Sequence, residues 1–250
     1  MLLETAGLTK RFGGVTAVNA VDLAVDERTT LGLIGPNGAG KTTLINLVSG
    51  VLVADEGTIR FAGADVTRER AHRLAARGIA RTFQGVRVFK GLSALDNVLI
   101  GAHTQLRPDV LTRLVPSRRP AETVDALALL ERVGLGRARA HALAGELPYG
   151  DQRRLEIARA LASRPRLLIL DEPAAGMNPT ESAALRGLMR SLVAEGLTII
   201  LIEHDVRLVM GACDRVVVLN FGRKIADAAP AEIQRDPVVR EAYLGSEDAA

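Results

Sequence analysis

The stretch Gly35-Pro36-Asn37-Gly38-Ala39-Gly40-Lys41-Thr42 decides the fold of this 250-residue chain. It fits the phosphate-binding pattern G-x-x-x-x-G-K-[ST] at every fixed position. The apolar run from Leu31 to Ile34 enters it as a buried strand does, and the residues from Lys41 to Ser49 follow as a predicted helix. A glycine-rich turn before an ordinary helix is the alternative, and it would not require all of these positions together. The motif therefore predicts a P-loop that binds a nucleoside triphosphate.

Each position of this loop has a task in phosphate binding. Glycines let several backbone N–H groups turn inward around a β-phosphate, and the following helix points its positive end at the same anion. Lys41 supplies a positive charge for the β- and γ-phosphate oxygens, and Thr42 supplies a hydroxyl that Mg²⁺ accepts in place of one water. The predicted nucleotide-binding residues of this region are Gly35, Pro36, Asn37, Gly38, Ala39, Gly40, Lys41, Thr42 and Thr43.

The composition indicates a globular protein with a well-buried core, since 48% of its residues are hydrophobic. The net charge is only +3, but arginines are crowded into one short part of the chain. We interpret this run as the solvated face of a helix, with binding to phosphate headgroups or nucleic acid as the alternative. Its members are Arg68, Arg70, Arg73, Arg77, Arg81 and Arg87.

The chain shows no feature of a secreted or membrane-spanning protein. The single cysteine, Cys213, excludes an internal disulfide and is expected to be a small buried residue in a reducing compartment. The first residues lack a basic segment followed by a long apolar stretch, so we expect no secretory signal. Apolar runs such as Leu197–Ile202 are much shorter than the ~20 residues of a membrane helix. We expect a cytoplasmic protein that reaches a membrane only through a partner.

The hydrophobic pattern changes along the chain and predicts an α/β fold. Residues 2–26 and 57–62 have the character of strands and predict an antiparallel sheet beside the nucleotide core. From Arg68 to about Ser163 the pattern is helical, which predicts an inserted helical subdomain. We therefore expect one domain over residues 1–250, with a core formed by 1–84 and 164–250 and a helical subdomain at 85–163.

The last third of the chain predicts a parallel sheet. Three apolar strands, at Leu167–Leu170, Thr198–Ile202 and Arg215–Leu219, alternate with helices that begin near Pro179 and Asp205. Residues 230–244 predict two short helices. The predicted fold is a P-loop NTPase core with a parallel sheet, an antiparallel β subdomain and the inserted helices.

Two acids end the strand that begins at Leu167. Asp171 is expected at the carboxyl edge of the sheet, opposite the phosphate loop, where it would hold Mg²⁺. Glu172 would polarise the water that attacks the γ-phosphate. A pair of solvated acids is the alternative. His204 directly follows the strand Thr198–Ile202 and would lie at the same edge, unless it is an ordinary surface histidine.

With these residues, the chain resembles the ATP-binding cassette ATPases. The sequence Leu147-Pro148-Tyr149-Gly150-Asp151-Gln152-Arg153-Arg154 stands where this family has its signature loop, although the usual L-S-G-G-Q spelling is not kept. The resemblance implies that Tyr149 and Gly150 contact nucleotide, that Gln84 senses Mg²⁺ and the attacking water, and that His204 is the switch histidine. Phe12 matches the aromatic residue that stacks on adenine. Ala175–Asn178 takes the place of the dimer loop, with Asn178 where aspartate is usual.

The resemblance implies three sets of site residues, some of which also belong to the phosphate loop. Those for catalysis are Lys41, Gln84, Glu172 and His204, those for Mg²⁺ are Thr42, Gln84 and Asp171, and Phe12, Tyr149 and Gly150 complete the ATP site.

Within the family, the spelling is most similar to the ATP-binding subunits of bacterial branched-chain amino-acid importers. The segments that carry this similarity are Tyr149-Gly150, Leu155–Arg159, Glu172–Gly176, Ile202–Asp205 and Ala242–Gly245. Such a subunit pairs with a second ATPase, homo- or heteromeric, and with integral-membrane permeases on the cytoplasmic face of the inner membrane. An external solute-binding protein takes part indirectly.

Other members of the family remain alternatives. Nucleic-acid ATPases of this kind carry a long coiled coil between the phosphate loop and the acidic motif, or two cassettes in one chain. Neither feature is found in this sequence, so we expect no nucleic-acid partner. A non-hydrolysing regulatory cassette would lack Glu172 or His204. A motor for another polar solute, or for export, stays open, because the solute contacts lie on other polypeptides.

Overall fold

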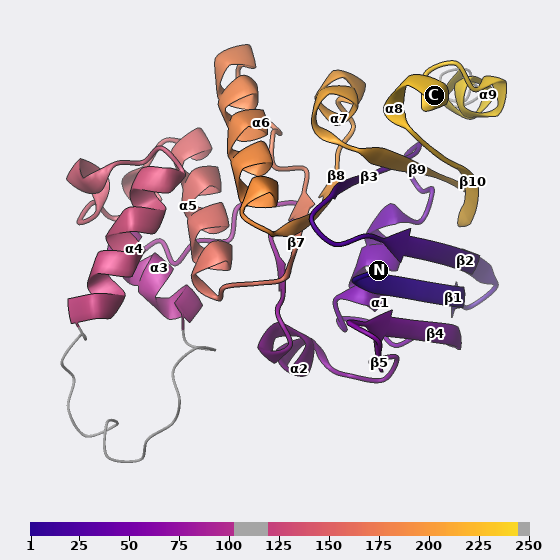
Figure 1. Ribbon diagram of the computed structural model, residues 1–250, viewed down its shortest axis with the longest axis horizontal. Coiled ribbons are helices and arrows are strands. Elements are labelled where there is room, and N and C mark those ends of the chain that lie inside the picture. The colour runs from indigo at the N-terminus through magenta and orange to yellow at the C-terminus, as the bar shows by residue number, and fades with distance from the viewer. Residues whose placement is uncertain (103–119, 245–250) are drawn as a thin grey trace.

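The computed structural model describes residues 1–102 and 120–244 and contains two β-sheets (Figure 1). The first is antiparallel and has the strand order β2-β1-β4-β5. Its strands are β1 (Leu3–Phe12), β2 (Val15–Val25), β4 (Glu56–Phe61) and β5 (Ala64–Asp65). The predicted antiparallel β subdomain is therefore confirmed.

The second sheet has six strands in the order β10-β9-β3-β8-β7-β6. All of its neighbouring pairs are parallel except β9 with β10. Its strands are β3 (Thr30–Ile34), β6 (Ile79–Arg81), β7 (Leu167–Asp171), β8 (Thr198–Ile202), β9 (Arg215–Asn220) and β10 (Arg223–Ala228). The parallel sheet predicted from the apolar runs is confirmed.

The helical prediction from Arg68 to about Ser163 is wrong at one place. The residues Ile79–Arg81 form β6, which pairs in parallel with β7 at the edge of the six-stranded sheet. This strand has only three residues and ends in a charged one, so it shows no recognisable period. Within the same region, Ala71–Ala76 forms the short helix α2.

The central strands are apolar at every position because both faces of the sheet are covered. In β8, Ile199 and Leu201 belong to one hydrophobic cluster, whereas Ile200 and Ile202 belong to another. The second cluster fills the space between the two sheets, where helix α1 (Lys41–Val48) also packs. The first cluster lies on the opposite face of the sheet. This double cover holds the phosphate loop, which connects β3 to α1, between two cores.

The remaining helices lie outside the two sheets. One group, which we call the α3–α5 group, forms the left end of the molecule in Figure 1, and a second group covers the six-stranded sheet. The first consists of α3 (Ala94–Gly101), α4 (Pro120–Arg132), α5 (Tyr149–Ala162) and the 3₁₀ turns η3 (Arg137–Arg139) and η4 (Ala144–Glu146). The second consists of α6 (Pro179–Ala194), α7 (Val206–Ala212), α8 (Pro230–Ile233) and α9 (Pro237–Leu244). Both predicted C-terminal helices are thus present.

Candidate functional site

The phosphate loop follows β3 directly and is shaped by close backbone contacts. Gly35 and Gly40 have φ angles of 148° and 100°. A Cβ at Gly35 would lie 2.1 Å from the carbonyl oxygen of Leu219, and one at Gly40 would lie 2.3 Å from that of Ala17. Only glycine fits at these two positions. By contrast, a Cβ at Gly38, where φ is 77°, would meet no atom within 4 Å.

Lys41 is the first residue of α1 and lies over the loop that precedes it. Its Nζ donates hydrogen bonds to the carbonyl oxygens of Gly35 at 2.6 Å and Pro36 at 2.9 Å. Burial lowers the pKa of this amine, and the charges of Glu172 and Asp171 partly offset that effect. Lys41 is therefore close enough to Asp171 and Glu172 for their charges to act on its amine.

Thr42 and Thr43 follow Lys41 in the first turn of α1. Thr42 is exposed and Thr43 is half-buried. The N-cap residue Gly40 has no side chain, so the first N–H groups of the helix keep no side-chain acceptor. The start of α1 therefore offers backbone N–H donors next to the exposed side chain of Thr42.

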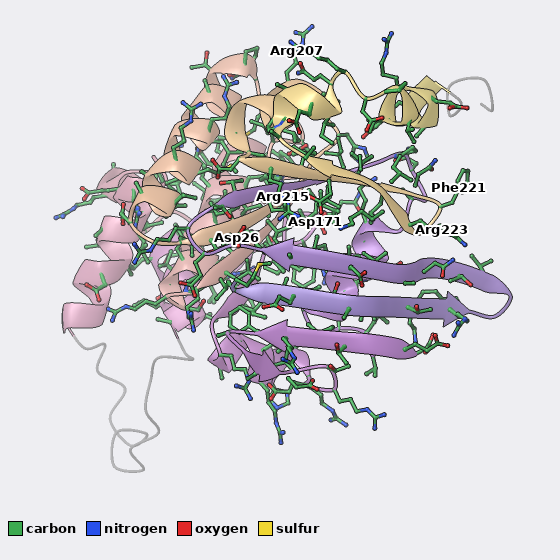
Figure 2. The ribbon with its side chains drawn as sticks, turned by 45° about the vertical axis from the view of Figure 1, so that its right-hand side comes forward. Asp26, Asp171, Arg207, Arg215, Phe221 and Arg223 are labelled. Carbon is green, nitrogen blue, oxygen red and sulfur yellow. The ribbon has the colours of Figure 1, made fainter. Side chains whose placement is uncertain are left out.

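Asp171 ends β7 in the interior of the molecule (Figure 2). Its Oδ2 accepts a hydrogen bond from Nη2 of Arg81 at 2.8 Å, and both side chains are buried. Arg81 also donates to Asn46 at 2.6 Å and Ser49 at 3.2 Å, which belong to α1 and its C-terminal cap. For Arg81, the interpretation of the arginine run as a solvated face is therefore wrong. The contact of Arg81 with Asp171 was not predicted, and its signal in the sequence is its place three residues before Gln84.

Glu172, Gln84 and His204 converge at the end of β7. His204 Nε2 lies 2.9 Å from Glu172 Oε1, and Gln84 Nε2 lies 3.3 Å from both carboxylate oxygens of Glu172. Glu172 has a φ of 50°, and its N–H donates to the carbonyl oxygen of Ile202 at 2.9 Å. A non-glycine residue in this region carries strain, and such strain is one feature of functional sites. The structure thus brings together three of the four predicted catalytic residues.

Glu203 supports this arrangement and was missed by the sequence analysis. It is buried and accepts hydrogen bonds from the N–H groups of Ala174 at 2.8 Å and His204 at 3.3 Å. Burial raises the pKa of this carboxyl group, although the two hydrogen bonds oppose the effect. The Glu203 side chain therefore connects the loop that follows Glu172 to the backbone of His204, just after the end of β8. Its acidic residue type directly after an apolar strand was the available signal.

The signature loop lies at the start of α5 and away from the phosphate loop of the same chain. In Figure 1, β7 lies between α5 and α1. Tyr149 is 48% exposed, and a Cβ at Gly176 would lie 3.3 Å from its ring. Gly150 is close to the side chain of Glu181. The two predicted signature contacts are thus not part of the cluster around Glu172; Tyr149 is exposed and Gly150 is half-buried.

Two further predicted residues have clear local positions. Phe12 ends β1, is 47% exposed, and has Nζ of Lys10 5.6 Å from its ring centroid. Asn178 is the N-cap of α6: its side chain accepts from the N–H of Glu181, and the Glu181 side chain accepts from the N–H of Asn178. Asparagine and aspartate serve equally well in such a capping box, which accounts for Asn178 in this loop.

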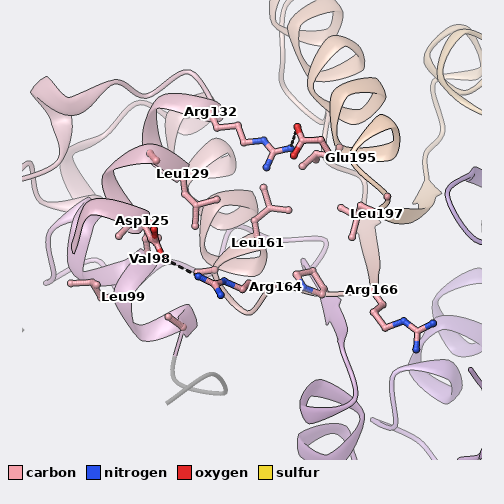
Figure 3. Close-up of a pocket in the computed structure, with 17 residues that line it drawn as sticks. Val98, Leu99, Asp125, Leu129, Arg132, Leu161, Arg164, Arg166, Glu195 and Leu197 are labelled. Carbon is pink, nitrogen blue, oxygen red and sulfur yellow. Dashed lines mark hydrogen bonds and ion pairs between the residues drawn. The ribbon is translucent and has the colours of Figure 1, made fainter. Parts of the chain in front are cut away.

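A cavity of about 660 Å³ lies between the α3–α5 group and the end of α6 (Figure 3). Val98, Leu129 and Leu161 line it, and two ion pairs border it, Arg132 with Glu195 at 2.5 Å and Arg164 with Asp125 at 2.9 Å. The predicted site residues are not among those that line this cavity. The cavity is therefore separate from the cluster around Glu172.

The helices in the described part of the chain, 1–102 and 120–244, include none long and apolar enough to cross a bilayer. Residues 18–175 match the family model of the ABC transporter, and residues 223–249 match that of the branched-chain amino acid ATP-binding cassette transporter.

Full-length relatives agree with these matches. The chain is 45% identical to the high-affinity branched-chain amino acid transport ATP-binding protein BraF of Pseudomonas aeruginosa and 44% identical to LivG of Escherichia coli, with 98% of each chain covered. Among solved structures, an ATP-binding cassette of an ABC transporter in its ADP conformation matches with a TM-score of 0.87 at 32% identity, and the match covers 98% of both chains. With a family model matched over residues 18–175 and relatives aligned over 98% of its length, this chain belongs to the ABC transporter family as one of its ATP-binding cassettes.

Proposed function

We propose that this chain is the ATP-hydrolysing subunit of an ABC importer for branched-chain amino acids. The convergence of Gln84 and His204 on Glu172 supports hydrolysis rather than regulatory binding, because a non-hydrolysing cassette would have no use for this cluster. The full-length similarity to BraF and LivG, together with the C-terminal family match, supports the solute class.

In this proposal, the phosphate loop binds the triphosphate of ATP. The N–H groups at the start of α1 and Nζ of Lys41 face the β- and γ-phosphates, while Phe12 stacks on the adenine. Tyr149 and Gly150 contact the nucleotide held by the phosphate loop of a second ATPase subunit. The 48% exposure of Tyr149 at the start of α5, which β7 separates from α1 in Figure 1, agrees with this role.

The residues near Asp171 fit a hard cation. Thr42 offers a hydroxyl and Asp171 offers Oδ1, which accepts no hydrogen bond from a described residue, while Arg81 holds Oδ2. Such oxygen donors suit Mg²⁺, which neutralises phosphate charge when bound. Gln84 is the third residue assigned to the ion and the attacking water. Arg81 fixes the orientation of the Asp171 carboxylate for this task.

Glu172 accepts a hydrogen bond from the attacking water and takes up its proton as the water oxygen bonds to the γ-phosphorus. The bond between this phosphorus and the bridging oxygen of ADP breaks, which leaves ADP and inorganic phosphate. His204 and Gln84 hold the Glu172 carboxylate from two sides. The hydrogen bond from the Glu172 N–H to Ile202 keeps that carboxylate at the end of β7, where Lys41 is also close enough to interact.

The α3–α5 group offers a surface for a permease. Phe89 is 48% exposed, and the buried side chain of Asn97 fixes its backbone, with hydrogen bonds of 2.8 Å from the Phe89 N–H and 3.1 Å to its carbonyl oxygen. A rigidly presented aromatic residue five positions after Gln84 is suited to receive a cytoplasmic helix of the permease. Such a contact would be made by a subunit bound peripherally at the cytoplasmic face of the inner membrane, which is the position we propose for this chain.

The test is ATP hydrolysis in vesicles that contain this chain, its co-purified permeases and the second ATPase. Addition of the cognate solute-binding protein with leucine, isoleucine or valine should raise hydrolysis and drive uptake. Stimulation by a different solute would refute the solute class but not the motor. Hydrolysis without dependence on a permease would refute the importer assignment.

A further inference from the structure

Two charged side chains of α5 lie buried against the segment that carries Gln84. Arg153 and Glu156 are each only 1% exposed, and Arg153 Nη1 lies 3.4 Å from Glu156 Oε2. Removing such groups from water is costly unless good hydrogen bonds compensate for the lost hydration. Apolar residues would fill the same space without this cost. The pair therefore requires an explanation other than packing.

The pair of Arg153 and Glu156 holds the backbone of Phe83 and Gln84. Arg153 donates from Nη1 to the carbonyl oxygen of Phe83 at 2.9 Å and from Nη2 to that of Gln84 at 2.6 Å. The N–H of Phe83 donates to Glu156 Oε1 at 3.4 Å. Burial raises the pKa of Glu156, while this N–H and the charge of Arg153 oppose the shift.

These backbone groups lie beyond the end of the sheet. β6 ends at Arg81, and the N–H of Thr82 makes the next hydrogen bond to β7, with Ile169 at 2.9 Å. After that point, the side chains of α5 take the place of a neighbouring strand for Phe83 and Gln84. The fork of an arginine is suited to this task, because its donors can reach two carbonyl oxygens at once.

The same arginine connects the outer surface to the cluster around Glu172. Its guanidinium lies 5.6 Å from the ring centroid of Tyr149, the exposed residue of the signature loop. On its other side, it holds the backbone of Gln84, whose Nε2 is 3.3 Å from both oxygens of Glu172. One buried side chain therefore touches the signature loop and the residue that holds Glu172.

We propose that Arg153 is a positioning residue for ATP hydrolysis, which fixes Gln84 relative to the signature helix α5. Contact at Tyr149 that shifts α5 then moves Gln84 and changes how it holds Glu172. Arg153 touches neither nucleotide nor water in this scheme. The inference rests on the proposed function, because it assigns a role in the reaction of that same site.

The first test compares Arg153→Met with Arg164→Met in the assembled transporter. Arg164 has a side chain that is 72% exposed and pairs only at the surface with Asp125, so it is a matched loss of one arginine. We expect Arg153→Met to lower kcat by ~10-fold or more with little change in KM for MgATP, since misplacement by ~1 Å can slow an enzyme strongly. Arg153→Lys keeps the charge but lacks the fork, and it should restore part of the rate.

The second test separates positioning from general stabilisation. In a Gln84→Ala background, Arg153→Met should lower kcat no further, because the residue through which it acts is already removed. In the nucleotide-free protein, hydrogen exchange at the amide of Phe83 should be faster in Arg153→Met than in the wild type or Arg164→Met.

The outcomes are distinguishable. Additive losses in the double variant, or an unchanged kcat for Arg153→Met, would overturn the role of Arg153 while leaving the proposed function intact. A wild-type complex that does not hydrolyse MgATP would instead refute the proposed function. If Arg153→Met fails to fold, the double-variant comparison is made with Arg153→Lys, and additive losses there would equally overturn the role of Arg153.

Discussion

The phosphate loop and the signature loop are the two motifs expected to meet nucleotide, yet the chain holds them very differently. The phosphate loop is fixed by backbone on several sides: Leu219 and Ala17 approach Gly35 and Gly40, and the N–H of Gly222 donates to Ala39 at 3.0 Å. The signature loop has an exposed Pro148 as the N-cap of α5, with no side-chain cap, and the exposed Tyr149 after it. One region is complete within the chain, and the other presents a surface to something outside it.

The side chain of Asp151 illustrates the second region. This residue stands where the family's signature has glutamine, and it is buried. It pairs with Arg139 and, at 3.7 Å, with Arg154, so its carboxylate is held inside the α3–α5 group. The outward contacts of the loop are therefore left to Tyr149, Gly150 and the start of α5. A signature loop with an unusual sequence can therefore still present the N-terminus of α5 as an anion-binding end.

The largest expected effect comes from the phosphate loop itself. Lys41→Ala removes the buried amine that lies over Gly35 and Pro36, so turnover should be lost and triphosphate binding should weaken. Lys224→Ala, which removes a lysine paired with Asp227 on β10, is the control. Steady-state hydrolysis and nucleotide titration report the result. Near-normal hydrolysis by Lys41→Ala would refute the assignment of the phosphate loop.

The second-largest effect is expected from a substitution of Glu172. Glu172→Gln keeps the shape of the side chain beside Gln84 and His204 but cannot take up a proton, and such groups contribute ~10²–10⁴-fold to rates. We expect retained ATP affinity, hydrolysis slowed within this range, and a stable ATP-bound dimer in gel filtration. Glu195→Gln, at an exposed pair with Arg132, should hydrolyse ATP normally. A Glu172→Gln monomer that still turns over would contradict the role of Glu172.

A smaller effect is expected from the signature loop. In the proposed dimer, Gly150→Asp would place a carboxylate beside the phosphates bound by the partner subunit, so hydrolysis in the dimer should fall by ~10-fold through repulsion. The isolated subunit should bind ATP as before, because Gly150 lies at the start of α5, and β7 separates α5 from α1 in Figure 1. Gly187→Asp, at an open position of α6, controls for an added charge, and Gly150→Asn, which crowds Glu181 in the same way without the charge, controls for that local contact. Loss of ATP affinity in isolated Gly150→Asp would show that the two regions are not separate.

The sequence predicted those parts of the fold and site that depend on local pattern. The phosphate loop has a fixed spacing, and strands such as β8 are apolar throughout because both of their faces are buried. Asp171, Glu172 and His204 could be placed because the carboxyl ends of parallel strands share one edge of a sheet. The cluster of Gln84 and His204 at Glu172 required the family resemblance in addition.

The missed residues are charged side chains whose partners are distant in the sequence. Arg81 pairs with Asp171, Arg153 holds Phe83 and Gln84, and in each case the partner lies on another element. Composition assigns such residues to the solvated surface, since arginine is rarely buried without a partner. Only the packing of α5 and β7 against the end of β6 reveals those partners. Local pattern therefore gives the site's framework, while its electrostatic supports emerge from tertiary contacts.

The smallest expected effect compares the chain's two tyrosines, one at each region. Tyr243 of α9 receives a hydrogen bond from the backbone of Gly35, and burial raises the pKa of its hydroxyl despite that bond. Tyr149 instead lies at the exposed start of α5.

Removing the Tyr243 hydroxyl leaves the Gly35 N–H without this acceptor, at a cost of about 1 kcal/mol. If the phosphate loop must be ordered to bind ATP, this cost corresponds to roughly a fivefold weaker ATP affinity. We therefore expect Tyr243→Phe to raise the Kd for ATP of the isolated subunit, measured by calorimetry, whereas Tyr149→Phe should leave that Kd unchanged because its loop serves the partner's site. Equal shifts from both substitutions would mean that the two loops are energetically coupled within one chain, and an unchanged Kd with a lower Tm for Tyr243→Phe would restrict α9 to a purely structural role.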